Sequence, residues 1–185
     1  GICYPDDRIQ VVFRLDMTGQ ALNANCHSVD PFKWASDEDG KSVFFTGGVH
    51  EDTPVCSTEG QEHCLTEDQV DEVHRALGAW VPNQISMFDN GTQGDALAGD
   101  GVWAFSVSLP YIDVAASPDG AGLRIGYKYT FGLPGQGWTD SQEWPGNQRL
   151  LELADLNDDH LIIRHDIFGD EAANKDKVNA LAPAK

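Results

Sequence analysis

Short apolar segments, each bounded by Gly, Pro, Asn or Asp, recur along most of this chain and constrain its fold more than any other feature. Several alternate apolar and polar residues, which is the pattern of half-buried strands. Short strands at such intervals are typical of a β-sandwich. The predicted strands cover residues 9–17, 43–48, 84–88, 102–109, 123–131, 149–153 and 161–168. The sequence therefore predicts an all-β sandwich.

One segment differs from this pattern and predicts a short helix. Residues 66–69 read Thr-Glu-Asp-Gln, a capping box in which the first and fourth side chains each satisfy a backbone N–H of the first turn. Val70, Val73 and Leu77 then follow at helical spacing, and Gly78 ends the pattern. We expect one helix over residues 66–77.

The chain has room for one domain with a sizeable core. At 185 residues, about 70% of the unfolded surface is buried on folding. We predict a single domain over residues 1–168, with a polar insertion at 50–64 and a polar tail or linker at 169–185. No apolar run approaches the roughly 18 residues of a membrane span, so membrane insertion is not expected.

The charge is strongly negative: 30 acidic against 12 basic residues, a net charge of −18. Such a surface repels phosphate backbones and anionic lipid, which disfavours nucleic acid and membrane surfaces as partners. It attracts divalent cations.

The four cysteines indicate where the protein works. We favour two disulfides, Cys3–Cys26 and Cys56–Cys64, because the second pair closes a short polar loop. This predicts an extracellular, periplasmic or cell-surface location. Free buried thiols in a cytosolic protein are the alternative. A zinc site is a weaker explanation of the cysteines, because no two of them have the usual two-residue spacing and only His63 lies beside a cysteine.

A glycine-punctuated acidic segment predicts a calcium site. Calcium takes six to eight oxygen ligands, and glycines let a short loop wrap around the ion. The candidate ligands are Asp89, Asn90, Asp95 and Asp100. Two polar turns joining strands explain the same residues equally well. A second acidic segment, at 155–160, opens like an EF-hand loop with Asp166 at the twelfth place, but His160 stands where Gly is needed, and a solvated turn is favoured.

Three tryptophans lie in turn-like contexts rather than in apolar strands: Trp80, Trp138 and Trp144. An exposed aromatic face beside amide or basic donors suits a sugar ring, which has an apolar face and a rim of hydroxyls. Core packing is the alternative for each one. Trp103 stands inside a strand and is predicted to be core.

These residues follow an order that resembles a known family. A Leu-Gly-x-Trp turn at 77–80 precedes a strand with Trp103 that ends in Ser-Leu-Pro, then a Gly-Tyr-Lys-Tyr strand at 126–129, then Trp144, Asn147 and Arg149. This order resembles the starch-binding-domain family of carbohydrate-binding modules, which are immunoglobulin-like β-sandwiches. The acidic segment resembles calcium loops of secreted bacterial surface domains.

The resemblance implies a glycan site. Trp80 and Trp144 would stack on glucose rings, and Lys128 and Asn147 would bind hydroxyls. From its turn-like context we add Trp138 as a candidate third contact. The Trp144–Asn147 gap is shorter than in the family, and a sandwich that has lost sugar binding is an alternative.

The leading hypothesis is a non-catalytic extracellular glycan-binding module. The resemblance implies an α-glucan as the ligand, and the sequence contains no motif of a hydrolase, metalloprotease or phosphate loop. The main rival is a structural or adhesive surface subunit stabilised by calcium and disulfides, with self-association or a neighbouring surface protein as partner. A small glycan-active enzyme is a third option.

Overall fold

The computed structural model describes residues 7–19, 21–22, 28–29, 40–112, 122–143, 148–155 and 157–170. The predictions for Cys3, Cys26, Trp144 and Asn147, and for most of the tail, lie outside these residues. The elements of the described part are β1 (Arg8–Asp16), β2 (Ala21–Leu22), β3 (Ser28–Val29), β4 (Ser42–Val49), α1 (Glu67–Ala76), β5 (Ile85–Ser86), β6 (Val102–Pro110), β7 (Arg124–Gly132), β8 (Arg149–Glu152) and β9 (Leu161–Ile167).

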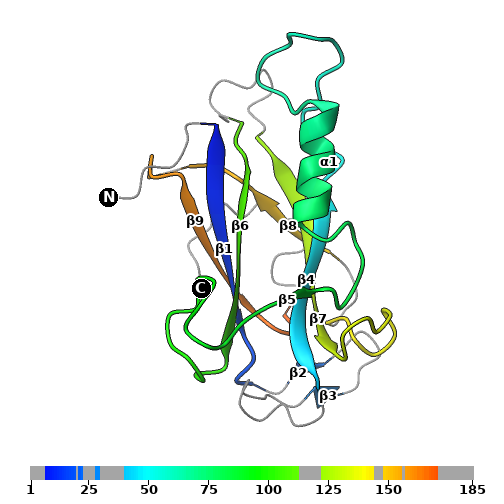
Figure 1. Cartoon of the computed structure of the whole chain (residues 1–185), viewed down its shortest axis with the longest axis vertical. Helices are drawn as coiled ribbons and strands as arrows, with labels where there is room; N and C mark the ends of the chain where they lie inside the picture. The colour runs from blue at the N-terminus through cyan, green and yellow to red at the C-terminus, as the bar shows by residue number, and fades with distance from the viewer. Residues whose placement is uncertain are drawn as a thin grey trace.

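The strands form two main sheets and one small pair (Figure 1). One sheet has the order β6-β1-β9, with β1 antiparallel to β6 and parallel to β9. The other has the order β5-β4-β7-β8, in which all neighbours are antiparallel. The pair β2-β3, which the sequence did not predict, stands apart from both. The seven other strands lie where the sequence predicts them, although β5 is shorter than expected.

The inner faces of the two sheets pack through aromatic rings. Phe13 of β1 lies with its ring centroid 4.6 Å from that of Phe45 in β4 and 5.0 Å from that of Tyr127 in β7. Phe105 of β6 lies 4.8 Å from Phe45. Offset and tilted rings at these distances add to the apolar burial that holds such a core together. The all-β sandwich is therefore confirmed.

One side of the sandwich is closed by the helix and by a strand that changes sheet. The capping box is present, with the Thr66 side chain accepting from the Gln69 N–H and the Gln69 side chain accepting from the Thr66 N–H. α1 lies beside β4 and β6, and its Val73 is fully buried in the core. Further along, β5 pairs with β4, while Phe88 pairs with Ala104 of β6. The chain therefore crosses between the sheets at this side.

The polar insertion is tied at its base. Cys56 and Cys64 form a disulfide with a Cα–Cα distance of 5.1 Å, as predicted. Beside it, Val55 and Leu65 form a parallel bridge, and Leu65 is fully buried. The disulfide and the β-bridge together fix Leu65, which directly precedes the N-cap residue of α1. In the described part of the chain, no helix is long and apolar enough to span a membrane.

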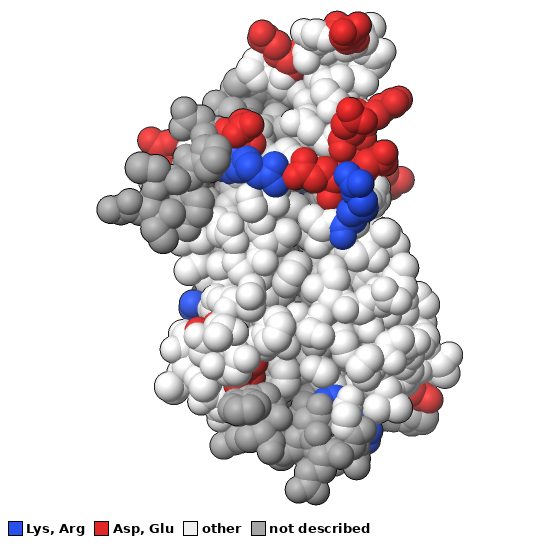
Figure 2. Space-filling view, viewed as in Figure 1, with Lys and Arg blue, Asp and Glu red and all other residues white. Residues whose placement is uncertain are grey.

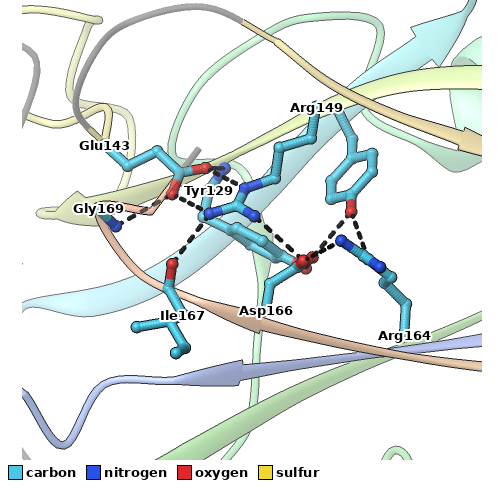
Figure 3. A network of polar contacts seen from close by, with 8 residues as sticks. Tyr129, Glu143, Arg149, Arg164, Asp166, Ile167 and Gly169 are labelled. Atoms are coloured by element: carbon cyan, nitrogen blue, oxygen red, sulfur yellow. Dashed lines mark hydrogen bonds and ion pairs between the residues drawn. The ribbon is translucent and has the colours of Figure 1, made fainter. Parts of the chain in front are cut away.

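The other side of the sandwich is closed by a buried polar network (Figure 3). Arg149 of β8 donates from Nε and Nη2 to the two carboxylate oxygens of Glu143, at 2.8 and 2.7 Å. Its Nη2 also donates to the Ile167 carbonyl of β9 at 2.9 Å. The N–H of Gly169 donates to Glu143 at 3.1 Å. These bonds link the edges of the two sheets, where no backbone ladder joins β8 to β9 in the described residues.

Asp166 is the second centre of this network. Its Oδ1 lies 3.1 Å from Arg149 Nη1 and 2.8 Å from Arg164 Nη2. Its Oδ2 accepts hydrogen bonds from the hydroxyls of Tyr127 and Tyr129, at 2.8 and 2.7 Å. Burial, with the nearby negative charge of Asp166, raises the pKa of both tyrosines well above the usual value, so both remain donors. The network is charge-balanced and well bonded, which is what a structural role requires.

Candidate functional site

The turn after α1 holds Trp80 in an unusual backbone conformation. Gly78, Ala79 and Trp80 all have positive φ, at 85°, 48° and 62°. Non-glycine residues rarely adopt this region, and such strain persists only where the surroundings impose it. Here Gly47 of β4 imposes it, because its N–H donates to the Leu77 carbonyl at 2.7 Å and its carbonyl accepts from the Trp80 N–H at 3.2 Å.

The indole ring of Trp80 lies over two glycines that pair across the sheet. Gly48 of β4 and Gly126 of β7 are register partners. A Cβ added at Gly48 would come within 2.7 Å of Trp80 Nε1, and one added at Gly126 within 3.1 Å of Trp80 Cζ2. The missing side chains therefore make the space that the ring occupies. We call the ring with these two glycines beneath it the Trp80 platform.

Polar and apolar side chains surround the Trp80 platform. His74 of α1 borders Gly48, and Gln148, an exposed residue before β8, borders Gly126. Val81, the residue that follows Trp80 in the sequence, is 43% exposed. His74 and Gln148 were not among the residues predicted from the sequence. The signal that could have found them was glycine inside a strand, which marks a close approach by another group.

The other residues predicted to bind sugar have different settings. Lys128 lies on the same face of β7 as Gly126, two residues along, but is only 4% exposed. Trp138 is half-buried in the loop that follows β7. That loop begins after Gly132, about 20 Å along the strand from Gly126. Trp103 is 3% exposed in the core, as predicted.

The acidic segment from Asp89 to Gly101, called the acidic loop below, is organised by one buried carboxylate. Asp89 is fully buried. Its Oδ1 accepts from the N–H groups of Gly99 and Asp100 at 2.8 and 3.2 Å, and its Oδ2 accepts from that of Gly101 at 3.0 Å. These bonds satisfy backbone donors that the tight turns would otherwise leave unpaired.

The structure brings three of the four predicted calcium ligands together. Asp89, Asp95 and Asp100 each offer an oxygen, and these oxygens all lie within 4.8 Å of one another. Asn90 is turned elsewhere, with its Oδ1 accepting from the N–H and hydroxyl of Thr92 at 3.1 and 2.6 Å. Oxygens gathered in this way suit a hard divalent cation, while the same bonds also serve two polar turns.

Like charges repel one another inside the acidic loop, and packing against β1 holds it in place. Burial raises the pKa of the Asp89 carboxyl above its ordinary value, and the charges of Asp95 and Asp100 add to the increase, while amide hydrogen bonds oppose it. A bound cation would relieve this repulsion. On the outer face of β1, Gly94 approaches the Val12 side chain, and its carbonyl accepts from Arg14 Nε at 3.1 Å.

The second acidic segment forms a turn rather than an EF-hand loop. Asp155 accepts from the N–H groups of Asp159 and His160 at 3.0 and 2.8 Å. Asp166, the twelfth residue of the pattern, points into the buried network instead. The solvated-turn interpretation therefore fits the structure.

Comparison with known proteins adds no family or function to this geometry. The chain matches no protein-family model and no curated protein.

Proposed function

We propose that this chain is a non-catalytic glycan-binding module of an exported protein, with the Trp80 platform as its binding surface. The observation that carries the proposal is the indole of Trp80 lying across the paired glycines Gly48 and Gly126. The ring packs against the backbone at both glycines, and the polar side chains of His74 and Gln148 lie beside it. This is the arrangement by which proteins bind the apolar face and hydroxyl edge of a sugar.

The strained turn supports the same proposal. A turn that served only to connect α1 to β5 would not need a large aromatic residue at positive φ. The Cys56–Cys64 disulfide supports export, because such bonds persist in oxidising compartments. The α-glucan specificity rests on the family resemblance of the sequence.

Calorimetric titration with maltoheptaose, together with a pull-down on insoluble starch, tests the proposal. We expect the wild type to bind, Trp80→Ala to lose binding, and Trp80→Phe, which keeps a flat ring, to retain part of it. Leu133→Ala removes an apolar side chain that is 48% exposed and serves as the control, with binding unchanged. Failure of the wild type to bind any glucan would refute the proposal.

A second candidate, a structural or adhesive surface domain stabilised by calcium, is favoured by the three converging carboxylates of the acidic loop. Calcium in hundredfold excess over its Kd would stabilise the fold by about 2.7 kcal/mol. Thermal unfolding in calcium and in chelator tests this, with Asp95→Asn and Asp100→Asn expected to abolish the difference. Identical melting temperatures with and without calcium would count against this candidate.

A further inference from the structure

Two ring nitrogens from different elements converge beside the Trp80 platform. His74 stands in the last turn of α1, and its Nδ1 lies 2.6 Å from the position that a Cβ on Gly48 would occupy. Trp80 Nε1 lies 2.7 Å from the same position. Both nitrogens therefore lie beside the Cα of Gly48, close to one another at one edge of the indole.

The ring nitrogens of His74 and Trp80 have no hydrogen-bonding partner in the part of the chain that the structure describes. Both residues are half-buried, and their ring nitrogens are within reach of solvent and of a ligand. A ligand stacked on the ring excludes water from these nitrogens, so it must itself supply the hydrogen-bonding partner that water otherwise provides.

We propose that His74 and Trp80 Nε1 together bind one hydroxyl group of a neutral sugar stacked on the Trp80 platform. The indole N–H donates to the hydroxyl oxygen, and the hydroxyl hydrogen is donated to the unprotonated nitrogen of the imidazole. A hydroxyl is donor and acceptor at once, so it satisfies both nitrogens. The inference rests on the proposed glycan-binding function and names the hydrogen-bonding residues of that site.

The charge around the site selects against acidic sugars. The helix that carries His74 also carries Glu67, Asp68, Asp71 and Glu72, and Figure 2 shows carboxylates gathered over α1. Their negative potential, with the net charge of −18, repels an anionic ligand. The ligand class is therefore a neutral hydroxylated ring.

The substitution His74→Phe tests the inference, because it keeps an aromatic ring of similar size and removes both nitrogens. One hydrogen bond is worth about 0.5–1.5 kcal/mol, so we expect the Kd for maltoheptaose in calorimetry to rise about 2- to 12-fold. His74→Gln, which restores a hydrogen-bonding amide, should recover part of the affinity. Unfolding curves of both variants report whether the fold is intact. If the Phe variant does not fold, the Kd of the Gln variant tests the inference.

A direct readout comes from nuclear magnetic resonance of the indole N–H groups. The Trp80 signal is identified by its absence in Trp80→Phe, and we expect it to shift when maltoheptaose is added to the wild type. A stationary signal during binding, or an unchanged Kd in both His74 variants, would overturn the inference and leave the proposed function standing. Equal affinity for polygalacturonate would overturn the neutral ligand class. No binding of maltoheptaose by the wild type would overturn both proposals together.

Discussion

Asp166→Asn is the substitution that the buried network predicts to be most damaging. The carboxylate of Asp166 contacts two guanidinium groups and accepts two phenol hydrogens, with all four contacts between 2.7 and 3.1 Å. The asparagine is nearly isosteric, so no cavity forms. It removes the negative charge, and its amide N–H₂ group faces donors where an acceptor is needed.

The size of the effect follows from burial. The side chain of Asp166 is 1% exposed and that of Arg149 is 2% exposed. Removing one member of such a pair costs about 3–5 kcal/mol, because the remaining charge stays buried without its partner. Glu143 still neutralises Arg149, which leaves Arg164 as the uncompensated charge. At this chain length, about 3–5 kcal/mol lowers the melting temperature by about 6–20 °C.

Urea unfolding followed by tryptophan fluorescence measures the loss. The matched control is Glu72→Gln, which breaks the ion pair between Glu72 and Arg8. In this pair the Arg8 side chain is 31% exposed and the Glu72 side chain is 39% exposed. An exposed pair of this kind contributes about 0–1 kcal/mol. If Asp166→Asn and Glu72→Gln reduce the free energy of unfolding by the same amount, below about 1 kcal/mol, the network does not hold the sheets together as argued.

Three further predictions follow from the other sites. Gly126→Ala places a Cβ against Gln148 Oε1 and within 3.1 Å of Trp80 Cζ2, so both side chains must move. Maltoheptaose binding should then weaken about tenfold in calorimetry, whereas Gly137→Ala, with no atom within 4 Å of its Cβ, should not change it. Reducing the Cys56–Cys64 disulfide, of sequence separation 8, should lower the free energy of unfolding by about 2.5 kcal/mol in urea; no change would contradict this. Because the folded-state pKa of Asp89 is raised from 3.8, its contribution to stability is complete below that pH and is lost as the pH rises through the folded value. Without divalent cations, Asp89→Asn should remove this part of the pH dependence of unfolding, and an unaltered profile would show that Asp89 does not cause it.

Local signals in the sequence predicted the elements well. The capping box at Thr66 needs only four consecutive residues, and each strand other than β2 and β3 has its own apolar pattern and flanking turn residues. The Cys56–Cys64 bridge was also predictable, because the two cysteines are close in the chain. Asp89, Asp95 and Asp100 come together because one short loop carries all three. Signals of this kind do not depend on which strand pairs with which.

The Trp80 platform could not be predicted in the same way. It needs Gly48 and Gly126 to be register partners, and these glycines lie far apart in the sequence, on β4 and β7. A shift of one residue in that register would place the glycines on opposite faces. Lys128 illustrates the same limit, because alternation places it on the outer face but does not show that other residues cover it. Long-range pairing, rather than local pattern, positions the site.

The strained turn allows a last prediction that separates the function of Trp80 from its structural role. Trp80→Ala and Trp80→Gly both remove the indole, so both should abolish glucan binding. They differ by one Cβ, which at a φ of 62° costs a non-glycine residue about 1–2 kcal/mol. We therefore expect Trp80→Gly to have the higher free energy of unfolding by about 1 kcal/mol, after allowance for the greater freedom of glycine in the unfolded chain. Urea unfolding measures the difference directly. Equal stabilities would mean that the turn relaxes once the ring is gone, and that the ring's packing on Gly48 and Gly126, rather than the hydrogen bonds of Gly47, imposes the conformation.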